Sequence, residues 1–287
     1  MMTGTAVTGR ELAEAVDRLG LTGRPVMLHG SLRSFGRPLA GGPDGLLDAL
    51  LWRGCTVLVP AFSEPYFDVP PPPGMRPERN GVDYAAFGRR PPLPDGPVYS
   101  PTCGLICARM GALPAALIAR GGARRGLHPL NSFAALGPLA AELAGAQTPA
   151  DLYAPVRLLA EHGGSVLLAG VGLDRMTALH LAEQRAGRRL FVRWARTGDG
   201  RVAMVEVGSC SEGFPRLGPR LAHLAASTTV AASRWTAYPA REMLDAAAAL
   251  IAADPTLTRC GHPRCRACPD AVAGGPLGPA PLEWRGA

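Results

Sequence analysis

The stretch VLLAGVGLDRMTALHLAEQR, residues 166–185, is the clearest structural unit in this sequence. Val166–Ala169 is an apolar run typical of a buried strand, and Gly170-Val171-Gly172 predicts a tight turn. Apolar residues then recur at helical spacing, which predicts a helix from about Met176 to Arg185. A strand, a glycine turn and a helix in this order indicate an α/β fold.

The same order of elements occurs near the N-terminus. Thr8 and Glu11 have the spacing of a capping box, which predicts a helix over 8–20. Val26–Leu28 and Thr56–Val59 read as short buried strands, with a Leu-rich helical segment between them. This βαβ rhythm predicts one mixed β-sheet flanked by helices.

The remaining periodic segments add further elements to this prediction. Their patterns predict helices over 105–119, 215–226 and 239–253, and strands over 190–194 and 202–207. The sequence contains no internal repeat. We therefore expect a single domain over residues 1–287, with a Pro-rich loop insertion over 65–98 and a flexible Gly/Pro-rich tail over 274–287.

Composition excludes several chemistries. All 30 basic residues are Arg, so a Walker phosphate loop and a Schiff-base lysine are both ruled out. The net charge of +7 suggests an anionic partner, but the charge is dispersed and aromatic residues make up only 6% of the chain. A phosphate-bearing cofactor accounts for this charge as well as a nucleic acid does, and we expect no nucleic-acid partner.

No segment predicts a membrane partner or export. The first twenty residues carry charges and lack the apolar core of a signal peptide. The most apolar window, 246–253, is much shorter than the roughly 20 residues that a bilayer requires. We therefore expect a cytoplasmic protein that is a monomer or a homodimer.

His180 and Glu183 are separated by three positions on the predicted helix and so share one face. A carboxylate beside an imidazole fixes its tautomer and raises its basicity, as a general base requires. A surface ion pair is the plainer interpretation of the same spacing.

Two loops have the composition of anion-binding sites. Ser31–Gly36 directly follows the first predicted strand, and its hydroxyls, backbone N–H groups and guanidinium could converge on an anion. His128 follows Arg124 and Arg125 in a second loop. Each stretch could equally be an ordinary polar turn.

Taken together and in order, these motifs resemble the aminoglycoside 3-N-acetyltransferase family. The motifs that carry this resemblance are His29-Gly-Ser-Leu-Arg-Ser-Phe-Gly36, Gly41-Gly42, Leu58-Val-Pro-Ala-Phe-Ser63, Pro101-Thr-x-Gly104, Arg125-x-x-His128-Pro-x-x-Ser132-Phe-Ala-Ala-x-Gly137 and the segment from Leu167 to Glu183. The chain departs from the family's usual residues at Gly30, Gly126, Ala154 and Met176.

The resemblance implies an α/β enzyme of antibiotic N-acetyltransferase type. Such an enzyme moves an acetyl group from acetyl-CoA to an amine of an aminoglycoside or a related aminosugar or aminocyclitol. His180 would be the general base, with Glu183 beside it. The residues that would hold CoA are Ser31, Leu32, Arg33, Ser34, Phe35, Gly36, Arg125, His128 and Ser132.

The chemistry of the individual residues agrees with this implication. An ammonium group must lose a proton before it attacks a thioester, and an imidazole held by a carboxylate takes that proton near neutral pH. Thr177, one turn before His180, could donate to the developing oxyanion, although it could instead cap the helix. Glu64, Asp68 and Asp83, in or near the Pro-rich loop, are candidate ligands for a polycationic substrate.

The segment Cys260-Gly-His-Pro-Arg-Cys265-Arg-Ala-Cys268 has the spacing of a tetrahedral zinc site. We expect a structural zinc knuckle over 255–272, with Cys210 or His262 as the fourth ligand. Reduced thiols in a flexible tail are the plainer alternative. Because these cysteines are far from His180 in sequence, we expect the knuckle to take no part in catalysis.

Two other functions remain open on sequence alone. A zinc-dependent hydrolase would need an open-coordinate metal near His180. A basic zinc-ribbon protein that binds nucleic acid would use the arginines around the cysteines.

Overall fold

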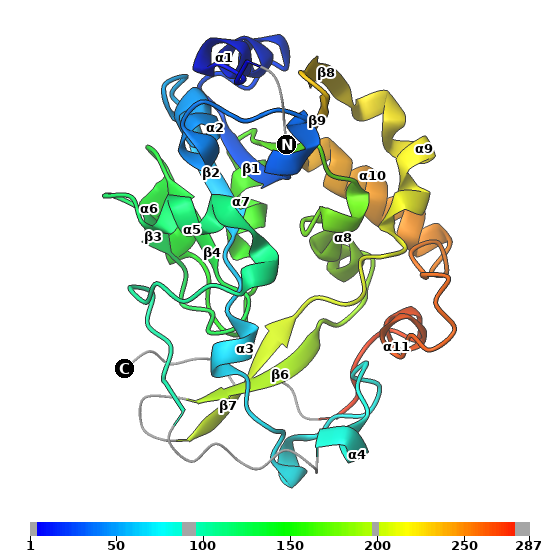
Figure 1. The fold of residues 1–287 in the computed structure, drawn as a ribbon. Coiled ribbons are helices and arrows are strands. Elements are labelled where there is room, and N and C mark those ends of the chain that lie inside the picture. The colour runs from blue at the N-terminus through cyan, green and yellow to red at the C-terminus, as the bar shows by residue number, and fades with distance from the viewer. Residues whose placement is uncertain (1–4, 88–95, 197–200, 279–287) are drawn as a thin grey trace.

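The computed structural model describes residues 5–87, 96–196 and 201–278. The strands lie in two sheets, and Figure 1 follows them along the chain. The strands are β1 (Pro25–Gly30), β2 (Thr56–Pro60), β3 (Arg124–Arg125), β4 (Phe133–Leu136), β5 (Ser165–Ala169), β6 (Phe191–Arg196), β7 (Val202–Val207), β8 (Ala226–Val230) and β9 (Ser233–Pro239). The α-helices are α1 (Gly9–Arg18), α2 (Gly42–Leu51), α3 (Glu64–Phe67), α4 (Tyr84–Phe87), α5 (Ala112–Ile118), α6 (Ala140–Gly145), α7 (Ala154–Glu161), α8 (Leu179–Arg185), α9 (Gly218–Leu221), α10 (Ala240–Ala253) and α11 (Ala267–Val272).

The larger sheet is mixed, as predicted. Its seven strands have the order β3-β4-β2-β1-β5-β9-β8, with β2, β1 and β5 parallel at the centre. The strands on either side of this central trio run antiparallel to it. Because the central strands are parallel, their carboxyl ends meet at one edge of the sheet, where open α/β sheets place their ligands.

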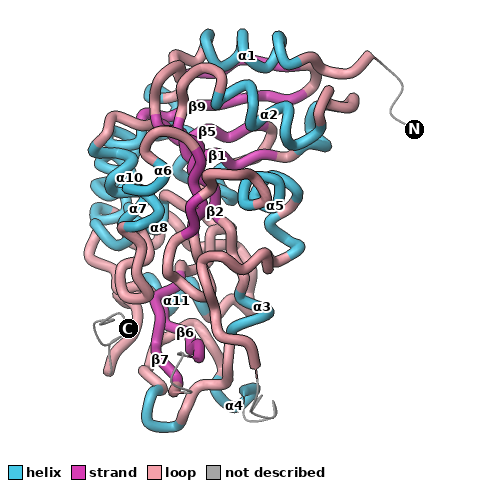
Figure 2. The backbone as a smooth tube through the Cα atoms, turned by 90° about the vertical axis from the view of Figure 1, so that its left-hand side faces the viewer, coloured by secondary structure: helices cyan, strands magenta, loops and turns pink. Residues whose placement is uncertain are grey.

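Helices cover both faces of this sheet, and Figure 2 shows the layers edge-on. Side chains alternate along β1, so Met27 enters one core while Val26 and Leu28 enter the other. The first core includes residues of α6, α7, α8 and α10, and the second includes residues of α1, α2 and α5. The central strands β1, β2 and β5 are therefore buried on both faces, which accounts for their apolar sequences.

The antiparallel pair β6 and β7 forms a separate two-stranded sheet. Figure 1 places it beyond the carboxyl edge of the large sheet, near α3, α4 and α11. The Pro-rich segment crosses this hairpin, where Val69 N donates to Trp194 O and Asn80 is bonded to the backbone of Val192. Part of the predicted 65–98 loop, residues 88–95, lies outside the described residues.

Several element predictions were wrong in detail. The helix expected over 105–119 begins only at Ala112. The helix expected over 215–226 is broken into short turns, because Pro215 and Pro219 each start a new turn instead of continuing the previous one. Strands β8 and β9 were not predicted, although β9 completes the central sheet beside β5.

The capping box predicted near the N-terminus is present, whereas the first residues of the expected flexible tail are hydrogen-bonded to the rest of the fold. Thr8 and Glu11 form the predicted capping box at the start of α1. In the expected tail, Leu277 exchanges two backbone hydrogen bonds with Glu78, and residues 279–287 lie outside the described part. No helix in the described ranges is long and apolar enough to span a membrane.

Candidate active site

His180 and Glu183 form a buried pair on α8. Nδ1 of His180 lies 2.7 Å from Oε2 of Glu183, and the two side chains are 8% and 4% exposed. A carboxylate can only accept this hydrogen bond, so Nδ1 carries the proton. Nε2 of His180, which has no hydrogen-bond partner among the described residues, is therefore the basic nitrogen. The predicted juxtaposition is present, and burial rules out a surface ion pair.

The imidazole ring of His180 is held by close packing. The Tyr153 ring stacks on it with centroids 6.2 Å apart, and Phe214 lies at 4.8 Å. Gly208 closes a third side: a Cβ added there would lie 2.7 Å from both His180 Cδ2 and the Tyr153 hydroxyl. Only glycine fits at position 208 without displacing the ring.

Several donors converge on the Glu183 carboxylate. Ser209 Oγ donates to Oε2 over 2.8 Å, and Oε1 accepts from Arg188 Nη1 and from Thr258 Oγ1. Burial alone would raise the pKa of Glu183, but the hydrogen bond and charge of His180 and the charge of Arg188 outweigh it and lower the pKa. The carboxylate is therefore ionised at neutral pH and available to stabilise an imidazolium.

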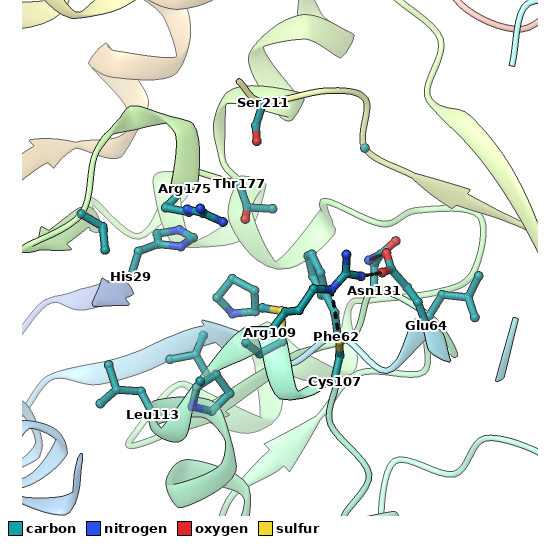
Figure 3. A pocket seen from close by; sticks show the side chains of 18 of the residues that line it. His29, Phe62, Glu64, Cys107, Arg109, Leu113, Asn131, Arg175, Thr177 and Ser211 are labelled. Atoms are coloured by element: carbon teal, nitrogen blue, oxygen red, sulfur yellow. Dashed lines mark hydrogen bonds and ion pairs between the residues drawn. The ribbon is translucent and has the colours of Figure 1, made fainter. Parts of the chain in front are cut away.

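His180 faces a large cleft of about 1730 Å³ between the carboxyl edge of the sheet and the β6–β7 hairpin. The end of β1, the loop after β5 and residues of the hairpin all line it. Thr177 also lines this cleft, and Figure 3 shows it beside Arg175. The cleft is large enough for a cosubstrate and an acceptor together.

Half of the predicted Ser31–Gly36 loop reaches the cleft. Ser31, Leu32 and Arg33 line it. Ser34 instead turns inward, donating to Ser31 O over 2.6 Å and lying 2.7 Å from Ser233 Oγ.

The last two residues of this loop also have structural positions. Phe35 is buried against the Trp235 ring, and Gly36 ends the 3₁₀ turn with a positive φ of 69°. The motif therefore has one half that lines the cleft and one half that fixes the turn.

The predicted CoA contacts of Arg125, His128 and Ser132 do not agree with the structure, because all three are buried and none lines the cleft. Arg125 donates to Ser132 Oγ and to backbone carbonyls including Ala61 O. These bonds give the arginine and serine a structural role in joining loops.

Both ring nitrogens of His128 are also taken by the protein. Nε2 lies 2.7 Å from Glu206 O, and Nδ1 accepts from the backbone N–H groups of Leu130 and Asn131. The composition of this cationic loop is thus that of an anion-binding site, but the Arg125 and His128 side chains hydrogen-bond to buried backbone groups instead.

One departure from the family's usual residues has a local explanation. A Cβ at Gly126 would lie 2.1 Å from Gln147 Oε1, which accepts from Phe133 N. The Gln147 side chain therefore fills the space that a serine at 126 would need.

Two of the three predicted acidic residues reach the cleft. Glu64 and Asp68 line it, and Figure 3 shows Arg109 extending to Glu64, with Nη2 3.1 Å from Oε2. Asn131 Nδ2 occupies the other Glu64 oxygen at 2.7 Å. Asp83 was wrongly predicted, since it pairs with Arg266 at 2.9 Å and does not line the cleft.

The structure brings four cysteines together. One ligand atom from each of Cys210, Cys260, Cys265 and Cys268 lies within 4.8 Å of the others. Cys210, and not His262, completes the set. In the described part of the chain no other group of three or more potential ligands gathers in this way, and His180 is not a member.

The residues that surround Glu183 could not be predicted from the sequence. Arg188, Ser209 and Thr258 come from separate parts of the chain, and no local periodicity connects them. Only the Gly208-Ser-Cys-Ser turn could have indicated part of this environment, because its small residues permit the chain to approach His180 closely.

A family model described as aminoglycoside 3-N-acetyltransferase matches residues 27–252, a region that contains most of β1, the residues that line the cleft and the His180–Glu183 pair. The chain belongs to this family. Membership of this family explains why the motifs on either side of the central strands follow one another in the family's order.

Among curated relatives, the chain is 35% identical to aminoglycoside N(3)-acetyltransferase IX of Micromonospora chalcea over 195 residues, which are 65% of each chain. It is 33% identical to aminoglycoside N(3)-acetyltransferase IV of Salmonella over 183 residues, or 61% of this chain and 58% of the relative. The matched region thus spans less than two thirds of these relatives.

Solved structures match over a greater length. The apoenzyme of aminoglycoside acetyltransferase AAC(3)-IVa superposes with a TM-score of 0.73 at 26% identity, covering 95% of this chain and 99% of that one. A histidine-to-alanine mutant of the same enzyme in complex with gentamicin gives a TM-score of 0.71 at 27% identity, covering 96% and 100%.

Proposed function

We propose that this protein transfers an acetyl group from acetyl-CoA to an amine of an aminoglycoside or a related aminosugar or aminocyclitol. One observation carries the proposal: a buried imidazole, oriented by an ionised carboxylate, opens onto a cleft large enough for both substrates. The family, and a solved relative titled as a complex with gentamicin, support the class of acceptor.

In this mechanism, Nε2 of His180 takes a proton from the acceptor amine while the amine nitrogen attacks the thioester carbonyl. The C–S bond of the tetrahedral intermediate then breaks, and the imidazolium returns the proton to the CoA thiolate. Glu183 stabilises the imidazolium between these two steps. Thr177, which lines the same cleft, is the proposed donor to the oxyanion.

Arg33 and its neighbours Ser31 and Leu32 are the proposed contacts for acetyl-CoA. They follow β1 at the carboxyl edge of the sheet, where backbone N–H groups and a guanidinium suit phosphate oxygens. Glu64 and Asp68, which line the same cleft, are the proposed contacts for acceptor ammonium groups.

The direct test of this proposal is a thiol-release assay with acetyl-CoA across a panel of aminoglycosides and simple amines. We expect CoA release that depends on an aminoglycoside, with a mass increase of one acetyl group on the antibiotic. Absence of release across the whole aminoglycoside panel would contradict the proposed acceptor class.

We further propose that the cysteine cluster holds a structural zinc ion. Four thiol donors within 4.8 Å fit the Cys₄ set that tetrahedral zinc prefers, and such a set leaves no open position for substrate. Zinc bound there would stabilise the fold by crosslinking the 208–213 turn to the segment after α10. A zinc-dependent hydrolase centred on His180 finds no support in this arrangement.

Elemental analysis tests the zinc proposal. We expect about one zinc ion per chain, lost together with thermal stability in the Cys265→Ser, Cys268→Ser double variant. Cys103→Ser is the matched control, because Cys103 lies outside the cluster. Wild-type protein purified without any bound zinc would overturn this proposal.

A further inference from the structure

The cysteine cluster is adjacent to the Glu183 carboxylate, contrary to the expectation from sequence distance. Ser209, which donates to Glu183, directly precedes the cluster residue Cys210. Thr258, which also donates to Glu183, precedes the cluster residue Cys260 by two positions. Both neutral donors to the carboxylate are thus anchored next to a metal-ligand candidate.

Arg188 connects the same two regions. Its side chain is 7% exposed, and Nη1 contacts both Glu183 Oε1 and Thr258 Oγ1, the latter over 2.8 Å. Nη2 donates to the carbonyl of Pro255, at the start of the predicted knuckle segment. This guanidinium therefore bonds at once to the proposed catalytic pair and to the chain that leads into the cysteines.

Close packing makes this connection rigid. A Cβ at Gly213 would lie 2.0 Å from Thr258 O, so the turn that carries Ser209 and Cys210 rests directly on the Thr258 backbone. Glu183, Cys210 and Cys268 also line one small void, which shows that no further layer of protein separates them. A displacement of either cysteine segment would move a donor to Glu183.

We infer that Ser209, Thr258 and Arg188 are positioning residues through which the cysteine cluster fixes the Glu183 carboxylate against His180. The expected change in turnover rests on the proposed function. The expected effect of removing the metal rests on the proposed zinc site. Its physical basis is that a carboxylate with fixed donors keeps one oxygen on Nδ1, whereas a carboxylate that loses donors can rotate away.

The first test removes one hydroxyl without touching a cysteine. Thr258→Val is nearly isosteric and should keep about one zinc per chain. We expect kcat to fall about tenfold, the effect of one lost hydrogen bond to a charged group, while the KM for acetyl-CoA stays unchanged. Thr258→Ser, which restores the hydroxyl, should recover most of the rate.

Thr256→Val is the matched control. It removes a nearby exposed hydroxyl that bonds only to Asp254, and we expect wild-type kcat. Ser209→Ala is a second, independent loss of a donor to Glu183, and we expect it to reproduce the Thr258→Val effect. Wild-type kcat in both Thr258→Val and Ser209→Ala would overturn the inference.

A spectroscopic readout separates this inference from the proposed function. The His180 Nδ1–H proton, held against a carboxylate, should give a downfield proton NMR resonance that does not require turnover. We expect it to weaken or shift in Thr258→Val, and in zinc-free Cys260→Ser protein that remains folded by circular dichroism. An unchanged resonance in zinc-containing Thr258→Val would contradict the inference, whereas absent turnover with an altered resonance would contradict only the acetyl-transfer proposal.

Discussion

Glu183 Oε2 lies 2.7 Å from Nδ1 of His180, and this contact assigns different tasks to the two imidazole nitrogens. Nδ1–H donates to the carboxylate, so Nε2 keeps the free lone pair that the proposed general base requires. The same contact explains why Glu183 is buried at 4% exposure yet remains ionised.

Gly208→Ala should impair catalysis without removing any polar group. The added Cβ would lie 2.7 Å from His180 Cδ2 and from the Tyr153 hydroxyl, so the imidazole must move. We expect kcat to fall by about 10²-fold, as for other displacements of a catalytic group by about 1 Å. Gly145→Ala, where an added Cβ meets nothing within 4 Å, is the control and should retain full activity.

Arg33→Ala and Arg125→Ala should have different consequences. Arg33 lines the cleft, so its loss should raise the KM for acetyl-CoA more than the KM for the amine. Arg125 is buried and bonded to several loops, so its loss should lower the melting temperature. Steady-state kinetics and thermal unfolding of both variants measure these two effects. A raised KM for acetyl-CoA in an Arg125→Ala protein that keeps its melting temperature would show that Arg125 does contact the ligand.

Acidification should destabilise the protein through two buried imidazoles. Burial lowers the pKa of His29 and of His128 to about 3. Because the unfolded chain binds these protons near pH 6.5, stability is lost as the pH falls from about 6.5 toward 3. Each imidazole can contribute up to about 1.4 kcal/mol per pH unit.

Urea unfolding between pH 7.5 and pH 4.5 measures this loss. His29→Gln has one imidazole fewer, so its free energy of unfolding should fall less steeply with acidification than that of the wild type. Equal slopes in the two proteins would show that His29 takes up no proton on unfolding.

The sequence predicts the centre of the fold well because its signals there are local. Strands β1, β2 and β5 are buried on both faces and read as continuous apolar runs. Strand β8 is exposed over most of its length, and its polar sequence gave no apolar alternation to detect. It forms a hairpin with β9 across only two residues, but this turn, Ala231-Ala232, lacks the glycine, asparagine or aspartate that usually marks a two-residue hairpin in a sequence.

At the site, too, local features could be predicted from the sequence and features that depend on distant segments could not. His180 and Glu183 could be paired from sequence because one helical turn joins them. Ser209 and Thr258 reach Glu183 only through folding, so the sequence could not show that the cysteine segments lie next to the His180–Glu183 pair. The buried role of His128 could not be predicted, because an imidazole that hydrogen-bonds to backbone groups has the same sequence pattern as one that binds a ligand.

The most direct test of the central claim is the rate of acetyl transfer by His180→Ala, measured by CoA release with an accepted aminoglycoside. His162→Ala is the matched control, since His162 pairs with Glu142 on the surface. We expect kcat to fall by about 10²-fold or more in His180→Ala with little change in CoA affinity, and wild-type turnover in His162→Ala. Near-normal turnover in His180→Ala would contradict its assignment as the general base.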